Sequence, residues 1–123
     1  MNDTAKTILI ADDDKDLLEV LTHRCKQLGL DVIDVEDALT ALSSVDFVTP
    51  DIICLDVEMP CGNGLAVCEM LASDENLSSI PVIILTGKKD DETIRRCHNL
   101  AAYYVPKCTN AWTRLEPLLC ELL

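Results

Sequence analysis

The apolar positions of the chain fall into short runs, and three of these runs have no polar face. They cover residues 7–11, 52–55 and 82–85. Runs of this kind are typical of strands that are buried on both sides, as in parallel sheets. Residues 31–35 and 102–105 also indicate strands. The pattern therefore predicts five strands.

Apolar residues at helical spacing lie between the predicted strands. In the first helix, four such residues are expected to share one face, and Gly29 is expected to end the helix. The four residues are Leu17, Leu21, Cys25 and Leu28. A second, shorter helix is predicted for residues 38–45, with Leu39 and Leu42 facing inward.

Three further helices complete the pattern. The third is predicted to begin at Asn63 or Gly64, and the fourth and fifth to cover residues 90–100 and 111–123. The third helix offers four residues to the core: Leu65, Val67, Cys68 and Leu71.

Five strands that alternate with five helices predict one parallel sheet with helices on both faces. Right-handed crossovers leave few arrangements, and the flavodoxin-like strand order 2-1-3-4-5 is the commonest for this number of strands. A chain of 123 residues has room for one core. We therefore expect residues 1–123 to form a single α/β domain, a flavodoxin-like (βα)5 three-layer sandwich without an output domain.

Composition limits the classes of function. The formal net charge of −12 argues against direct binding of nucleic acid, because phosphate contacts need basic residues. No apolar run approaches the ~20 residues that cross a bilayer, and the first residues lack a signal-peptide pattern, so we expect a cytoplasmic protein. The seven cysteines include no CxxC pair and are expected to be reduced thiols.

Polar side chains follow four of the predicted strands at the point where each strand ends. Asp12 and Asp13 follow the first strand and Asp56 the third, while Thr86 and Lys107 follow the fourth and fifth. The carboxyl ends of parallel strands share one edge of the sheet, so these side chains are expected to converge there.

Three clustered carboxylates repel one another unless a cation lies among them, and Mg²⁺ is the natural partner for such oxygen ligands. A hydroxyl and an ammonium group opposite the metal would complete a clamp for a phosphoryl group. Asp56 would then be the nucleophile, since aspartate carboxylates form acyl phosphates. The residues expected at this edge of the sheet therefore predict a site for phosphoryl transfer.

Four segments carry a resemblance to a known family: ILIADDDKDL, DIICLDVEMPCGNGL, PVIILTG and AYYVPK. In this order and at these spacings, the chain resembles the receiver domain of two-component response regulators, the CheY-like family. The resemblance covers essentially the whole chain. It implies that Asp56 accepts a phosphoryl group from the phosphohistidine of a histidine kinase. It also implies that Asp13 and Asp56 bind Mg²⁺ directly, Asp12 through water, and Glu58 through its backbone carbonyl.

The resemblance implies a switch as well. Thr86 would hydrogen-bond the phosphoryl group, Lys107 would pair with it, Gly87 would leave room for it, and Tyr104 would turn inward as Thr86 moves. The surface read by partners would comprise the fourth helix, fifth strand and fifth helix. Such a domain is not an enzyme beyond its own phosphotransfer and autodephosphorylation. Its implied partners are a sensor histidine kinase or phosphotransfer protein, a downstream target or fused output domain, and, after phosphorylation, a second copy.

The chain departs from the family pattern at three positions. Cys108 replaces a proline that usually follows the lysine through a cis bond, and we predict a trans Lys107–Cys108 bond because a cis bond before a non-proline residue costs ~2.5–4 kcal/mol. Pro117 lies inside the last predicted helix, so we expect a kink near residues 113–117 or a helix in two pieces. Leu100 stands where glycine is common, so the turn before the fifth strand is expected to differ.

Three other interpretations compete with the phosphoacceptor. The alternation of acids from Asp12 suggests a calcium loop, but Leu17 and His23 stand where that loop needs glycine and glutamate. The DxD pattern at Asp56–Glu58 is shared with haloacid-dehalogenase-like phosphatases, which need a larger chain. A receiver-like protein-interaction module that does not depend on phosphorylation remains as the alternative.

Overall fold

The computed structural model describes residues 5–123, so residues 1–4 of the predicted domain lie outside the described part. Its centre is a sheet of five parallel strands in the order β2-β1-β3-β6-β7. These strands are β1 (Thr7–Ala11), β2 (Asp31–Val35), β3 (Ile52–Leu55), β6 (Val82–Thr86) and β7 (Tyr103–Pro106). With the short β4 and β5 set aside, this is the predicted order 2-1-3-4-5, and the flavodoxin-like fold is confirmed.

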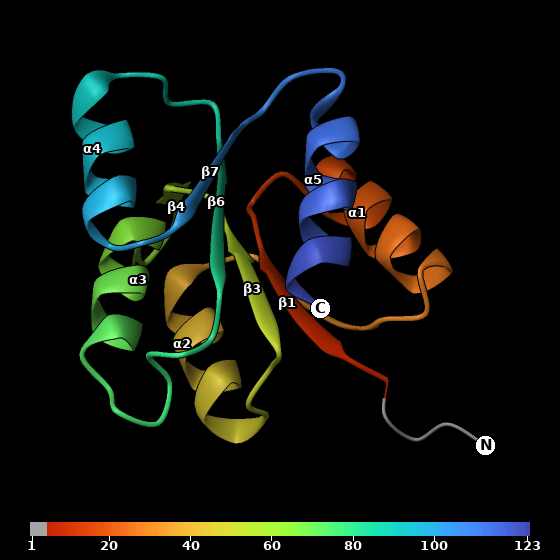
Figure 1. Ribbon diagram of the computed structural model, residues 1–123, viewed down its shortest axis with the longest axis horizontal. Coiled ribbons are helices and arrows are strands. Elements are labelled where there is room, and N and C mark those ends of the chain that lie inside the picture. The colour runs from red at the N-terminus through yellow and green to blue at the C-terminus, as the bar shows by residue number, and fades with distance from the viewer. Residues whose placement is uncertain (1–4) are drawn as a thin grey trace.

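Helices cover both faces of the sheet (Figure 1). Helices α1 (Lys15–Gln27) and α5 (Ala111–Leu122) lie on one face. Helices α2 (Ala38–Phe47), α3 (Gly64–Ala72) and α4 (Asp91–Asn99) lie on the other. Within residues 5–123, none of these helices has the length and apolar character needed to cross a membrane.

The two faces of the sheet form two separate cores because neighbouring residues of a strand point to opposite sides. On β1, Leu9 points into the core beneath α2 and α3. Its neighbours Ile8 and Ile10 point into the core beneath α1 and α5. The double-sided burial predicted for the apolar runs is therefore the basis of the three layers.

Short polar side chains fix the starting points of α1 to α4. Each of these helices begins after an aspartate or asparagine whose side chain accepts a hydrogen bond from the third backbone N–H of the helix, which removes one unpaired donor. The four N-cap residues are Asp14, Asp37, Asn63 and Asp90. Helix α5 begins after Asn110, whose side chain makes no such bond.

The inward face of α2 differs from the prediction. Leu39 is 62% exposed, so its predicted inward orientation is wrong. The buried residues of this helix are Ala38, Ala41 and Val45, which share one face at spacings of three and four, while Leu42 is half-buried. Small residues allow α2 to approach the sheet, and its larger leucine points to solvent.

The inward face of α1 matches the prediction at Leu21 and Cys25 but not at the two ends of the helix. Leu18, Leu21 and Cys25 are buried, whereas Leu17 is only half-buried. Leu28 lies at the C-cap of the helix and is exposed, so its predicted place on the inward face is wrong.

Two helices end in the same turn with different residues. After α1, Gly29 has a φ of 85°, and its N–H donates to the Lys26 carbonyl. After α4, Ala101 has a φ of 57°, and its N–H donates to the His98 carbonyl. The expected change at Leu100 therefore falls one residue later, where an alanine occupies a left-handed position that favours glycine.

Helix α5 continues without interruption through Pro117. The predicted division into two pieces is therefore wrong, and the predicted kink near residues 113–117 stays a prediction. Proline removes one backbone hydrogen bond, but the helix keeps a continuous apolar face toward the sheet through Leu115 and Leu119.

A two-stranded hairpin, absent from the prediction, lies between β3 and α3. Its strands are β4 (Glu58–Met59) and β5 (Gly62–Asn63), and they pair antiparallel. The turn between them holds Cys61 at a φ of 60°, and Gly62, the first residue of β5, has a φ of 122°. The Pro60 carbonyl accepts a hydrogen bond from the Ala38 N–H at 3.2 Å, so the hairpin is tied to the start of α2.

Candidate functional site

Asp12 and Asp56 leave two neighbouring strands at the same edge of the sheet. In the pairing of β1 with β3, Ala11 lies opposite Leu55, and the Asp56 N–H donates to the Ala11 carbonyl at 3.0 Å. Both aspartates are buried. Together with the exposed Asp13, they each offer a carboxylate oxygen within 4.8 Å of the others. The parallel register thus places three acids from two segments in one pocket.

Lys107 joins this acidic cluster from β7. Its Nζ lies 2.8 Å from Asp56 Oδ2 and 2.8 Å from Asp12 Oδ2. The backbone N–H of Lys107 donates to the Thr86 carbonyl at 2.8 Å, which holds the residue at the end of β6. The ammonium group therefore bridges the two buried carboxylates.

Burial and pairing act in opposite directions on the charges of this cluster. Burial raises the pKa of Asp12, and this effect outweighs the lowering by the hydrogen bonds from Lys107 and the Asp14 N–H. For Lys107, burial lowers the pKa, but the hydrogen bonds to Asp12 and Asp56 together raise it above its ordinary value. The lysine is therefore held in its charged form.

The charge balance of the cluster fits a divalent cation. Three carboxylates and one ammonium leave two negative charges uncompensated when all groups are ionised. Buried charges without compensation are costly, and clustered oxygens at this spacing are ligands for hard divalent cations. Asp12, Asp13 and Asp56 are the residues that could hold such an ion.

Thr86 and Tyr104 both bind the loop between β6 and α4. Thr86 is completely buried, and its Oγ1 accepts a hydrogen bond from the Lys88 N–H at 3.2 Å. The Tyr104 hydroxyl donates to the Lys88 carbonyl at 2.6 Å, and its ring packs against the core beneath α3 and α4. Lys88 thus connects the buried hydroxyl at the sheet edge to the aromatic side chain on β7.

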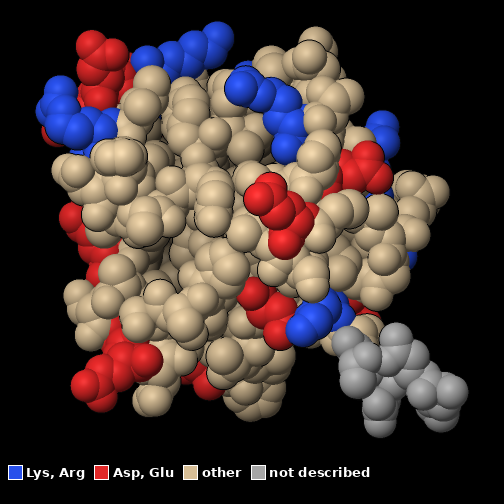
Figure 2. All heavy atoms as spheres, in the orientation of Figure 1, with Lys and Arg blue, Asp and Glu red and all other residues tan. Residues whose placement is uncertain are grey.

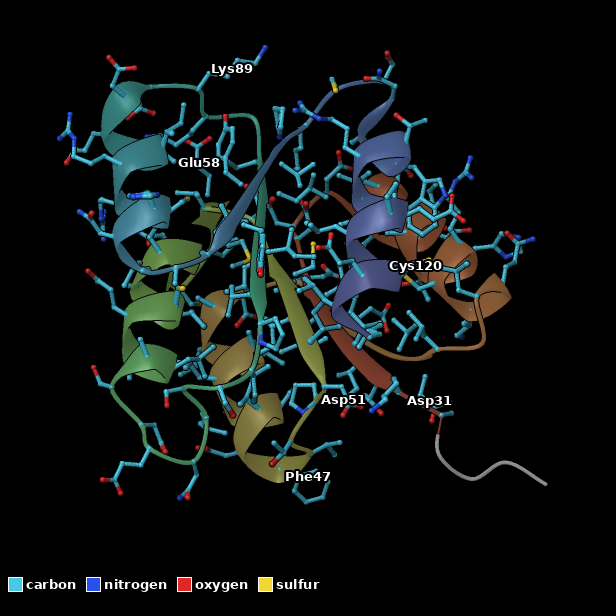
Figure 3. The ribbon with its side chains drawn as sticks, viewed as in Figure 1. Asp31, Phe47, Asp51, Glu58, Lys89 and Cys120 are labelled. Atoms are coloured by element: carbon cyan, nitrogen blue, oxygen red, sulfur yellow. The ribbon has the colours of Figure 1, made fainter. Side chains whose placement is uncertain are left out.

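The hairpin after Asp56 lies against the acceptor residue. The Glu58 N–H lies 3.4 Å from Asp56 Oδ1, while the Glu58 side chain is exposed and points away from the sheet (Figure 3). Gly64 passes directly over Asp56, because a Cβ at Gly64 would lie 2.1 Å from the Asp56 carbonyl oxygen. The sequence indicates Gly64 as a possible start of the third helix, but its spacing from Asp56 does not reveal this close approach.

The Lys107–Cys108 bond is trans, as is every peptide bond in the described part of the chain, so the prediction is confirmed. The Cys108 thiol donates to Asn110 Oδ1 at 2.9 Å. This contact uses the oxygen that would otherwise cap α5. The loop after Lys107 is therefore closed by a thiol–amide contact, and Lys107 still reaches both aspartates.

Comparisons with known proteins agree with this geometry. The family model described as "Response regulator receiver domain" matches residues 8–114. The DNA-binding response regulator MtrA of Mycobacterium tuberculosis is 37% identical over 90 residues, which are 73% of this chain and 38% of that protein. The alkaline phosphatase synthesis transcriptional regulatory protein PhoP of Bacillus subtilis is 33% identical over 86 residues, which are 70% of this chain and 35% of that protein.

A solved structure extends the likeness to the fold. The signal receiver domain of a signal transduction histidine kinase from Syntrophus aciditrophicus matches with a TM-score of 0.87 at 30% identity, covering 97% of this chain and 90% of that chain. The chain spans less than two fifths of the curated relatives it matches. Since the family model covers most of its length and a solved receiver domain shares its fold, the chain belongs to the response regulator receiver domains of two-component signalling.

Proposed function

We propose that Asp56 is the phosphoacceptor of this receiver domain and takes a phosphoryl group from a phosphohistidine of a histidine kinase or phosphotransfer protein. The observation that carries the proposal is the bridge from Lys107 Nζ to Asp56 Oδ2 at 2.8 Å, beside two further carboxylates. In the transfer, a carboxylate oxygen of Asp56 forms the new bond to phosphorus as the phosphorus–nitrogen bond to histidine breaks.

Mg²⁺ is the proposed cofactor of this step. Asp13, Asp56 and the Glu58 carbonyl would bind it directly and Asp12 through water, which agrees with the uncompensated charge of the cluster. When bound, the ion would neutralise negative charge on the phosphoryl oxygens. The Glu58 N–H contact to Asp56 supports this assignment because it keeps the Glu58 backbone beside the acceptor.

Lys107 and Thr86 are the proposed sensors of the phosphoryl group. Lys107 would pair with a phosphoryl oxygen, and Thr86, whose Oγ1 accepts a hydrogen bond from the Lys88 N–H, would turn to donate its hydroxyl to another phosphoryl oxygen. Because Tyr104 is hydrogen-bonded to the Lys88 carbonyl, a movement of this loop would reposition Tyr104. The surface formed by α4, β7 and α5 would then change and be read by a partner.

The proposed setting is cytoplasmic two-component signalling by a single domain of residues 1–123. Its output is a downstream protein or a fused domain, and phosphorylation can bring two copies together. The chain itself does not bind nucleic acid, because its net charge is −12. Its chemistry is limited to its own phosphotransfer and autodephosphorylation.

Incubation with Mg²⁺ and acetyl phosphate tests the proposal. We expect a labile adduct with the mass of one phosphoryl group on Asp56, lost in Asp56→Asn and kept in the control Asp46→Asn, whose residue is exposed on α2. Multiple-turnover hydrolysis of a phosphomonoester, which is a poorer phosphodonor than an acyl phosphate, would instead indicate a phosphatase. A folded protein that forms no adduct would indicate an interaction module that does not depend on phosphorylation.

A further inference from the structure

An apolar patch is exposed at the end of α2. Phe47 is 89% exposed, and together with Val48 and Ile33 it lines a shallow groove of about 460 Å³. Leu39, two helical turns earlier on the same face, is 62% exposed. We call this surface the α2 patch. Its residues are Ile33, Leu39, Ser43, Phe47 and Val48.

The part of the chain around the α2 patch carries charge of only one sign. No lysine or arginine occurs between Lys26 and Lys88, whereas half of the 22 acidic residues fall there. Figure 2 shows the lower left of the molecule, over α2 and α3, with acidic and no basic atoms, while basic atoms gather along the upper edge. The surface that holds the exposed phenylalanine is therefore strongly acidic.

Exposed acids surround the patch itself. Asp46 precedes Phe47 on α2, and Asp51 follows a few residues later, where β3 begins. Asp31 lies on β2 two residues before Ile33 and so points to the same face of the sheet. Figure 3 shows Phe47 and Asp51 at the same end of the molecule, beyond the starts of the strands. The patch thus has an apolar centre and a mainly acidic rim, with the exposed Lys6 beside Asp31, whose N–H donates to the Lys6 carbonyl.

This combination limits what can cover the patch. Nucleic acids and anionic lipid surfaces are repelled by the acidic rim. A second copy that used the same face would bring two acidic rims together, because a two-fold interface pairs each patch with itself. A positively charged partner with apolar side chains would satisfy both parts of the surface, since complementary charge sets partner choice and buried apolar residues supply affinity.

We propose that the α2 patch binds a cationic segment of another protein, with apolar side chains against Phe47 and Leu39 and lysine or arginine side chains beside Asp31 and Asp46. The patch runs along the exposed face of α2, from Leu39 near the carboxyl ends of the strands to Phe47 at their amino ends, whereas Asp56 is buried. The partner can therefore bind without covering the phosphoacceptor or the surface formed by α4, β7 and α5.

A synthetic amphipathic helix made of leucine and lysine is the probe for this surface. We expect it to shift the amide resonances of α2 and β2 in the whole chain, while the same peptide with glutamate in place of lysine does not bind. Phe47→Ser and Leu39→Ser should each raise the dissociation constant at least tenfold. Val20→Ser, which changes an exposed apolar residue on α1, should alter it less than twofold.

A charge pair gives the second arm of the test. Asp31→Asn combined with Asp46→Asn should weaken binding and flatten its dependence on salt more than the control pair Asp16→Asn and Glu19→Gln on α1. Equal weakening by the patch and control variants, or no binding of the lysine peptide, would overturn the proposal. A dimer in sedimentation equilibrium that Phe47→Ser abolishes would also overturn it, because the occupant would then be a second copy.

Discussion

The backbone of Gly64 passes so close to Asp56 that a methyl group added at Gly64 would lie 2.1 Å from the Asp56 carbonyl oxygen. The same methyl group would lie 2.9 Å from the Asp56 carbonyl carbon. These neighbours are backbone atoms of the acceptor residue, which cannot rotate away as a side chain can. Gly64 therefore allows α3 to begin directly over the acceptor.

Gly64→Ala is expected to destabilise the fold by about 3 kcal/mol, because one of the two backbones must shift. Urea unfolding measures the change. Gly87→Ala is the matched control, since a Cβ at Gly87 meets nothing within 4 Å, and it should change stability by less than about 0.5 kcal/mol. Similar stabilities for the two variants would contradict the close approach.

Ala101→Gly is expected to stabilise the protein by about 0.5–1 kcal/mol, because glycine adopts the left-handed conformation of this turn at lower cost. Gly29→Ala, at the equivalent turn of α1, should destabilise it by about 1 kcal/mol. Thermal unfolding of both variants checks the pair. Changes of the same sign would show that the two turns are not equivalent.

Lys107→Met is expected to leave Asp12 and Asp56 without their common partner. The lysine side chain is only 23% exposed, so we expect a loss of about 1–3 kcal/mol in the absence of divalent ions. Added Mg²⁺ should then raise the melting temperature more than it does in the unaltered protein, because a cation restores the balance. A melting temperature that does not respond to Mg²⁺ in either protein would contradict the metal assignment.

Stability is expected to fall as the pH rises above 9. Burial raises the pKa of Cys25 and of Cys68 from 9.0 to about 11. Between these values the unfolded thiols lose their protons and the folded ones keep them, so ionisation favours the unfolded state. Each thiol contributes at most about 2.7 kcal/mol to this loss, once the pH exceeds both values.

Urea unfolding at pH 8, 9 and 10 measures the effect. Cys25→Ala should reduce the slope of stability against pH, whereas Cys120→Ser should not, because Cys120 is exposed. An identical slope for Cys25→Ala and the unaltered protein would rule out a contribution from this thiol. The comparison uses slopes, since Cys25→Ala also leaves a small cavity in the core beneath α1.

The sheet and the acidic edge could be predicted because each has a direct signal in the sequence. Runs such as Ile52–Leu55 are apolar at every position and end in a charged residue, and parallel strands bring such ends together. The inward orientation predicted for Leu39 is wrong because α2 is rich in small and apolar residues. Its pattern does not show whether the leucines or the alanines face the sheet. Packing against the sheet decides in favour of Ala38 and Ala41.

Other features depend on contacts that no periodic pattern records. The hairpin of β4 and β5 has two residues in each strand, too few to show alternation. The left-handed conformation of Ala101 follows from how α4 must turn into β7, although alanine itself disfavours it. Pro117 predicts a kink in α5 or a helix in two pieces, and burial of Leu115 and Leu119 on either side of it keeps the helix in one piece.

The hydrogen bond from the Ala38 N–H to the Pro60 carbonyl makes the two ends of α2 different in their contacts. One end holds the loop that follows the acceptor, and the other carries Phe47 into solvent. Thermodynamic linkage is symmetric. If a ligand bound near Phe47 favours the phosphorylated form of the loop, phosphorylation of Asp56 must raise the affinity of that ligand by the same factor. The ten residues of α2 would then couple binding at Phe47 to phosphorylation at Asp56 in both directions.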